Sequence, residues 1–145
     1  MCPKTVVQNK IIQDIFYNLI TKTTCESLIG FMKLSFLIVG TMKSGTSTLA
    51  DLLNQSQNIY LPEDELHFFN NKFDFGFDWY ENELNKDIPL FKKKESLLIG
   101  EKTPTYSYKK ECAQKIFNYS KDLKLIWIFR DPVKRAFSNY LHAVK

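Results

Sequence analysis

Apolar positions along this chain fall into short uninterrupted runs that alternate with stretches of helical periodicity. The short runs predict buried strands, and the periodic stretches predict helices with one apolar face. Strands are expected at residues 34–39, 58–61, 97–100 and 123–129. Helices are expected at residues 44–54, 79–84 and 108–119, and from Pro132 onward, because proline suits the first position of a helix. This alternation indicates an α/β fold, a parallel sheet with helices on both faces.

The residues before the first strand follow a different pattern. Apolar side chains between residues 5 and 20 recur at spacings compatible with an amphipathic helix, and residues 21–27 form a connector. We therefore expect an N-terminal helical extension over residues 1–33, either a packing helix or a poorly ordered segment. The α/β domain is expected to occupy residues 34–145.

Aromatic residues are concentrated between Pro62 and Leu90, where they are mixed with acidic side chains. This segment predicts a structured aromatic loop with one short helix, and its rings are expected in the core rather than in a substrate platform. In the following helix, the residues expected to face inward are Cys112, Ile116 and Phe117.

Composition and charge narrow the class of protein. With 44% hydrophobic and 14% aromatic residues, the chain is typical of a globular protein, and 145 residues suffice for one core. The net charge of +4 suits an anionic ligand but is too small to predict nucleic-acid binding. The densest basic cluster, at residues 92–94, is expected to be a solvated loop.

Cysteine and histidine usage argues against two kinds of site. Cys2, Cys25 and Cys112 are odd in number and widely separated, so they predict neither a disulfide framework nor a zinc site. A reducing compartment is the simpler interpretation. His67 and His142 also lack a partner at metal-ligand spacing, so no metal is predicted.

Candidate chemistry begins where the first predicted strand ends. The apolar run breaks at Gly40 into a turn rich in hydroxyl groups, with Lys43 and Gly45 inside it. A buried strand, a glycine turn and a helix N-terminus together form a phosphate cradle, because free backbone N–H groups point at the anion. Gly40 and Gly45 have the spacing of the nucleotide-triphosphate loop, but Thr46 stands where that loop has its lysine. The pattern therefore indicates a phosphate-bearing donor other than ATP or GTP.

Charged residues follow three of the predicted strands. They are Lys43, the pair Glu101-Lys102 and the pair Arg130-Asp131. Because ligands of open parallel sheets bind beyond the carboxyl ends of the strands, we expect these residues to converge. Arg130 and Ser138, eight residues later and two helical turns on, can close on one phosphate, since arginine supplies a charged planar fork and serine a short donor. The alternative for Arg130 is a helix cap or an ion pair with Asp131.

Two of these segments resemble the donor-binding motifs of the sulfotransferase family, which uses 3′-phosphoadenosine 5′-phosphosulfate (PAPS). One is Lys43-x-Gly-Thr-Ser after the first strand, and the other is Arg130-Asp-Pro-x-x-Arg-x-x-Ser138 after the last. The resemblance implies that Lys43 lies near the bridging oxygen of the donor, and that Arg130 and Ser138 bind its 3′-phosphate. The residues implied to cradle the 5′-phosphosulfate are Lys43, Ser44, Gly45, Thr46, Ser47 and Thr48.

The middle of the chain resembles the branch of the family that acts on glycosaminoglycans, the heparan sulfate sulfotransferases. The similar segments are Glu-Leu-His-Phe-Phe at 65–69, residues 76–80 and Glu-Lys-Thr-Pro-Thr-Tyr at 101–106. The resemblance implies that Glu65 is the catalytic base, that Lys102 lies beside the transferring group, and that His67 belongs to the active site. The alternatives are a surface acid for Glu65, a core histidine for His67 and a salt bridge to Glu101 for Lys102.

The resemblance covers about residues 34–140, and the part of the family domain that closes over the donor's adenosine has no counterpart in the sequence. We therefore expect a partial, P-loop-like sulfotransferase domain. The leading hypothesis is a sulfotransferase that moves a sulfuryl group from PAPS to a hydroxyl or amine of an acceptor, a glycan first of all. The alternatives are a non-catalytic, truncated nucleotide-binding module and a P-loop nucleotide kinase.

Location and assembly follow from less specific signals. The apolar residues 28–40 are too few to span a bilayer, and the N-terminus lacks a secretory pattern, so no membrane segment is predicted. As written, the chain is expected to be soluble and cytoplasmic. The Golgi lumen, usual for the glycan-acting branch, is the alternative if the N-terminus is incomplete. No pattern predicts an oligomeric state.

Overall fold

A computed structural model of the chain describes residues 33–92 and 96–144. The predicted N-terminal helical extension falls almost wholly on residues 1–32 and so lies outside the described residues.

The core of the fold is a four-stranded sheet, as the apolar runs predict. Its strands are β1 (Leu34–Gly40), β2 (Ile59–Tyr60), β3 (Leu98–Lys102) and β4 (Lys124–Trp127). Their order across the sheet is β2-β3-β1-β4, and each neighbouring pair is parallel. The carboxyl ends of all four strands therefore lie at one edge. The predicted α/β fold with a parallel sheet is confirmed.

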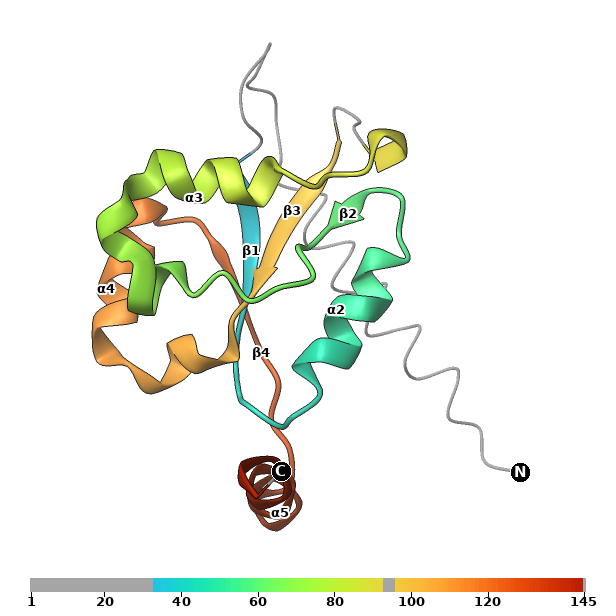
Figure 1. The fold of residues 1–145 in the computed structure, drawn as a ribbon, viewed down its shortest axis with the longest axis vertical. Coiled ribbons are helices and arrows are strands. Elements are labelled where there is room, and N and C mark those ends of the chain that lie inside the picture. Colours follow the sequence, from blue (N-terminus) through green and yellow to red (C-terminus); the bar gives the residue numbers. More distant parts are fainter. Residues whose placement is uncertain (1–32, 93–95, 145) are drawn as a thin grey trace. The chain divides into compact units, whose positions relative to one another are not determined.

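Helices cover both faces of the central strands. In Figure 1, α2 (Thr46–Asn54) lies on one side of the sheet, and α3 (Gly76–Asn85) and α4 (Lys110–Tyr119) lie on the other. The last helix, α5 (Pro132–Ala143), lies beyond the carboxyl end of β4. It begins at the predicted proline, and the Asp131 side chain caps it by accepting a hydrogen bond of 2.9 Å from the Lys134 amide.

The aromatic segment is more ordered than a loop. A π-helical turn (Phe68–Lys72) and a 3₁₀ turn (Phe73–Phe75) lead directly into α3. The ring of Phe68 stacks on that of Tyr80 at 4.3 Å between centroids, and both side chains are fully buried. The rings of Phe68 and Tyr80 belong to the core, as predicted, because stacking excludes them from solvent. The prediction is wrong for Phe75 and Phe77, whose side chains are exposed.

Two strand and helix predictions need correction. Strand β3 runs on through Glu101 to Lys102, two residues past the predicted end, and a 3₁₀ turn (Pro104–Tyr108) precedes α4. In α4, Cys112 and Ile116 are buried as predicted, but Phe117 is 50% exposed. The prediction for Phe117 is therefore wrong. Phe117 directly follows the buried Ile116, and neighbouring residues of a helix point about 100° apart, so the two side chains face in different directions.

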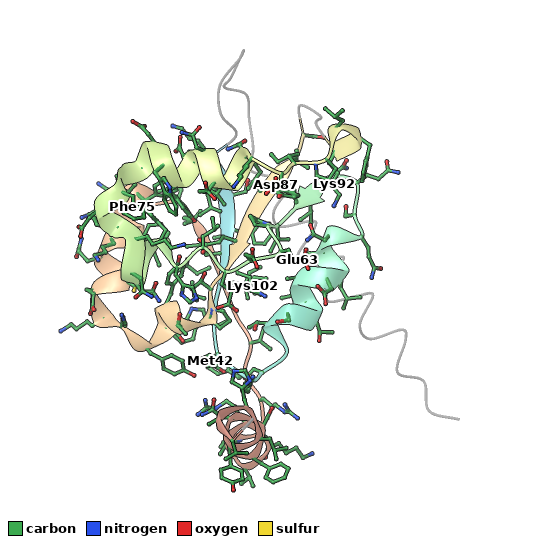
Figure 2. The ribbon with its side chains drawn as sticks, viewed as in Figure 1. Met42, Glu63, Phe75, Asp87, Lys92 and Lys102 are labelled. Atoms are coloured by element: carbon green, nitrogen blue, oxygen red, sulfur yellow. The ribbon has the colours of Figure 1, made fainter. Side chains whose placement is uncertain are left out.

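The prediction of a solvated loop at residues 92–94 is also wrong for Lys92. This side chain is buried, and its Nζ donates hydrogen bonds to the carbonyl oxygens of Asn54 and Ile59. Asn54 is the last residue of α2, so Lys92 binds the carbonyl end of that helix, where a cation is favoured. Figure 2 shows Lys92 close to β2.

Strand β4 is less covered than its neighbours. Along it, half-buried and exposed positions alternate, and Leu125 and Trp127 are about half exposed. Helix α5 contains no buried residue, and its exposed apolar side chains include Phe137 and Tyr140. Among the described residues, the prediction of helices over both faces therefore holds for the central strands and not for β4.

Candidate active site

The loop between β1 and α2 is held in a bent conformation by its own hydroxyl groups. Thr41 Oγ1 lies 2.6 Å from Ser44 Oγ and donates to the carbonyl of Ile128 at 3.1 Å, which ties the loop to the segment after β4. Lys43 and Gly45 both have a positive φ, of 63° and 97°. Such a backbone is strained for lysine and unstrained for glycine, which explains the glycine at the last position of the turn.

Gly45 is the N-cap of α2, and no side chain caps this helix. Ser44 precedes this position, but its hydroxyl bonds to Thr41 and does not cap the helix. The first turn of a helix carries backbone N–H groups without intrahelical partners, and their dipoles favour an anion. The start of α2 therefore keeps the backbone chemistry of a phosphate cradle.

Arg130 and Lys43 lie together at the end of the sheet. Arg130 Nη1 donates a hydrogen bond of 3.0 Å to the backbone carbonyl of Lys43. This contact joins the segment after β4 to the loop after β1. Ser138, the other predicted phosphate ligand, is half-buried on α5. Arg130 does not act as a cap of α5 in the described structure, because Asp131 fills that role.

The candidate site contains one cluster of ionisable side chains, formed by Glu65, His67 and Lys102. Glu65 Oε2 lies 3.6 Å from His67 Nε2, and Glu65 Oε1 lies 3.7 Å from Lys102 Nζ. The Lys102 ammonium also lies 3.4 Å from Ser47 Oγ in the first turn of α2. Lys102 thus links the carboxylate to the helix start, and the alternative considered for it, a salt bridge to Glu101, is not the pairing observed. Figure 2 shows Met42 and Lys102 at the carboxyl ends of β1 and β3.

The cluster is placed between solvent and core. The side chains of Glu65 and His67 are about one-third exposed, and that of Lys102 is 12% exposed. A carboxylate beside a lysine in such a position is reachable by a substrate, yet its charge is less screened than on an open surface. Glu65 can therefore accept a proton, and Lys102 can stabilise negative charge that develops close to Ser47.

Two residues that sequence reasoning missed bind His67. Asn70 Nδ2 lies 3.3 Å from His67 Nδ1, and Thr105 Oγ1 lies 3.5 Å from the same nitrogen. With the amide of Asn70 as donor, Nδ1 accepts, so a neutral ring carries its proton on Nε2, which faces Glu65. The signal available in the sequence was the spacing of Asn70, three residues after His67, within a turn of helix.

Within residues 33–92 and 96–144, no group of three or more His, Cys, Asp or Glu side chains is arranged to hold a metal ion. None of the helices in these ranges has the length and apolar character that crossing a membrane requires.

Comparison with known proteins identifies the family. A family model described as "Sulfotransferase domain" matches residues 34–145. This chain belongs to the sulfotransferase family. A sulfotransferase from Alicyclobacillus acidocaldarius, solved by crystallography, superposes with a TM-score of 0.65 at 28% identity, over 78% of this chain and 51% of that one. The predicted family and its P-loop-like α/β fold are confirmed.

Curated proteins that are similar to this chain are also named as sulfotransferases. The membrane-associated sulfotransferase kil1 of Dictyostelium discoideum is 35% identical over 112 residues, which are 77% of this chain and 23% of that protein. Human heparan sulfate glucosamine 3-O-sulfotransferase 3B1 is 35% identical over 104 residues, 72% of this chain and 25% of that enzyme. The chain therefore spans about a quarter of the length of these relatives. Its likeness to glycosaminoglycan-modifying sulfotransferases, predicted from residues 65–69 and 101–106, is confirmed.

Proposed function

We propose that this chain forms the donor side of a PAPS-dependent sulfotransferase that acts on a hydroxyl or amine of a glycan. The observation that carries the proposal is the position of Lys102, whose Nζ lies 3.7 Å from Glu65 Oε1 and 3.4 Å from Ser47 Oγ. One cation therefore adjoins both the candidate base and the start of α2. A transfer reaction needs these two groups on either side of the transferring group.

The residues at the sheet edge fit a donor with phosphate groups at both ends of its ribose. The start of α2, with Gly45 as its N-cap and no capping side chain, supports binding of a phosphosulfate by backbone N–H groups and by Lys43. Arg130 and Ser138 are proposed to bind the 3′-phosphate. Arg130 is exposed and bonds through Nη1 to Lys43, so its other guanidinium nitrogens remain available to an anion.

The chemistry follows from where charge develops. In sulfuryl transfer the bond between sulfur and the bridging phosphate oxygen breaks as the bond from sulfur to the acceptor oxygen or nitrogen forms. Lys43 and Lys102 are proposed to stabilise the leaving phosphate, where negative charge grows. Glu65 is proposed to take the acceptor's proton, a contribution of about 10²–10⁴-fold to the rate. His67, with its Nε2 3.6 Å from Glu65, is proposed to orient this carboxylate.

The glycan acceptor is proposed from the relatives. Several are named as heparan sulfate glucosamine 3-O-sulfotransferases, and their similarity extends over 72% of this chain. The mildly basic balance of the chain, with a net charge of +4, suits an anionic polysaccharide.

A second candidate is a nucleotide-binding module without transferase activity. It is favoured by the exposed apolar residues of β4 and α5, the elements on either side of Arg130. Such a module would bind adenosine 3′,5′-bisphosphate through Arg130 and the loop after β1 but would position no acceptor.

The test is transfer of radiolabelled sulfate from PAPS to heparan sulfate, with the Glu65→Gln variant as a matched control. The proposal predicts transfer by the wild-type chain and a rate about 10²–10⁴-fold lower for E65Q, with unchanged binding of adenosine 3′,5′-bisphosphate in calorimetry. Binding without transfer in both proteins supports the second candidate. Binding of ATP with magnesium, and none of the bisphosphate, contradicts both.

A further inference from the structure

A fully buried carboxylate lies next to the candidate active site. Glu101 precedes Lys102 in β3, and its side chain has no exposed surface. Its Oε1 accepts hydrogen bonds from Thr103 Oγ1 at 2.6 Å and from the Tyr106 hydroxyl at 2.8 Å, and its Oε2 accepts one from the Tyr80 hydroxyl. A buried carboxyl group is tolerated only when it is hydrogen-bonded in this way.

Two of the three hydroxyl groups extend this network to the segment that carries His67. Thr103 Oγ1 accepts a long hydrogen bond of 3.5 Å from the His67 amide, and the Tyr106 hydroxyl accepts one of 3.4 Å from the Phe69 amide. A hydroxyl has one proton, so donation to Glu101 leaves its oxygen to accept from the backbone. The amides of His67 and Phe69 are thus connected, each through one hydroxyl, to the same carboxylate oxygen.

The backbone at His67 needs such support. Its φ is 55°, in the left-handed region that residues other than glycine rarely adopt. A conformation of this kind is strained and persists only where the surroundings hold it. The same bend directs the His67 ring toward Glu65, with 3.6 Å between Nε2 and Oε2. A shift of this backbone would therefore move the ring relative to the candidate base.

We propose that Glu101 is a positioning residue. Through Thr103 and Tyr106 it holds the backbone of His67 and Phe69, and so sets the His67 ring against Glu65. Both links end on Oε1, whereas Oε2 faces Tyr80. A protonated Oε2 can donate to the Tyr80 hydroxyl, and the links through Oε1 are unchanged. A glutamine at this position can keep them in the same manner. The catalytic part of this inference rests on the proposed function, but the positioning of His67 does not.

The experiment compares three variants that each remove one hydroxyl group from Glu101. Thr103→Val and Tyr106→Phe cut a link to the segment that carries His67. Tyr80→Phe removes a bond to the same carboxyl group but cuts no such link, and it is the matched control. We expect kcat for sulfate transfer to fall about 10-fold or more in T103V and Y106F, with the KM for PAPS unchanged, and to stay within about twofold in Y80F. Thermal unfolding of each variant checks that it is folded.

A second readout does not depend on activity. The sequence has two histidines, His67 and His142, so their imidazole signals in NMR spectra can be assigned with a His142→Gln variant. The His67 signals should shift in T103V and Y106F, and Glu101→Leu should shift them further, whereas E101Q and Y80F should leave them near the wild-type positions. The inference is overturned if T103V and Y106F leave the His67 signals unchanged, or if Y80F shifts them equally. If the wild-type chain shows no transfer activity, the proposed function is contradicted. The NMR comparison alone then decides whether Glu101 positions His67.

Discussion

Arg130 donates a hydrogen bond of 3.0 Å from Nη1 to the backbone carbonyl of Lys43. The two residues are far apart in sequence and follow different strands, β4 and β1, which are neighbours in the sheet. The contact therefore places a guanidinium group beside the loop at the start of α2. The proposed donor has phosphate groups on both sides of its ribose, and this contact brings two of its proposed ligands to the same end of the sheet.

Substitution of Arg130 tests the role of this guanidinium. Arg130→Met should weaken binding of adenosine 3′,5′-bisphosphate about 10- to 100-fold, because a charge-assisted hydrogen bond contributes about 1.5–3 kcal/mol. Calorimetry measures the change. Lys134→Met, which removes an exposed positive charge from the first turn of α5, is the control and should bind almost normally. Equal losses in both variants would show that net charge alone, and not Arg130, governs binding.

Gly45 tests the loop itself. A Cβ at this position would meet no atom within 4 Å, so the cost of Gly45→Ala comes only from its φ of 97°. We expect a loss of about 1–2 kcal/mol in the free energy of unfolding and a weakened affinity for adenosine 3′,5′-bisphosphate. Gly76→Ala is the control for a strained glycine outside the site. Gly76 has a φ of 83° and equally open surroundings, but its ψ is 165° where that of Gly45 is 22°, so its loss of stability should be the larger. It should lose stability and keep the affinity. Unaltered nucleotide binding in G45A would argue against the loop as the cradle.

Lys92 is predicted to stabilise the fold rather than to bind a ligand. Lys92→Met removes the donor to the carbonyl groups of Asn54 and Ile59, and leaves buried acceptors without it. Urea denaturation should show a loss of about 1–3 kcal/mol. Lys86→Met, at an exposed lysine whose pairing with Glu83 spans 3.8 Å, should change stability by less than about 0.5 kcal/mol. If the two variants unfold at the same urea concentration, the buried hydrogen bonds of Lys92 contribute nothing measurable.

Glu101 should make stability depend on pH. Burial raises the pKa of its carboxyl group, an effect that hydrogen bonds from Thr103, Tyr80 and Tyr106 partly offset and the nearby Glu65 charge reinforces. The folded state then holds this proton more tightly than the unfolded state does. The stability that Glu101 contributes is therefore fully present below the ordinary carboxyl pKa and is lost as pH rises through the folded-state pKa. Relative to E101Q, which cannot titrate here, the wild-type free energy of unfolding should fall from about pH 4 upward. A difference that stays constant or grows with pH contradicts this assignment.

The positions of the strands were predictable because each contains a run of apolar residues, although β4 ends at Trp127, two residues before its predicted end. The order of the candidate site residues along the chain followed from these positions. The end of β3 was not predictable, because Glu101 and Lys102 are charged and a charged pair usually marks a loop. Glu101 lies inside the sheet because hydroxyl groups from Tyr80 and Tyr106 bind its carboxyl group. That pairing joins residues of different elements, and a single sequence contains no signal of which distant side chains will meet.

The same limit applies to Lys92 and to the contacts of His67 in the cluster around Glu65. A run of three lysines is normally solvated, and only the approach of the α2 carboxyl end and β2 gives Lys92 its acceptors. The approach of Lys102 to Glu65 and Ser47, in contrast, was foreseeable in outline, because parallel strands end at one edge of a sheet. The geometry around His67, including Asn70 and Thr105, depends on a local bend that hydrophobic patterning does not encode.

The most direct test of the account is a comparison of two nucleotides by calorimetry on the wild-type chain: adenosine 3′,5′-bisphosphate and adenosine 5′-monophosphate, which differ only in the 3′-phosphate. The account predicts tighter binding of the bisphosphate, by about 10-fold or more, with the advantage lost in Arg130→Met. Equal affinities for the two nucleotides, or a preference that survives the loss of Arg130, would contradict it.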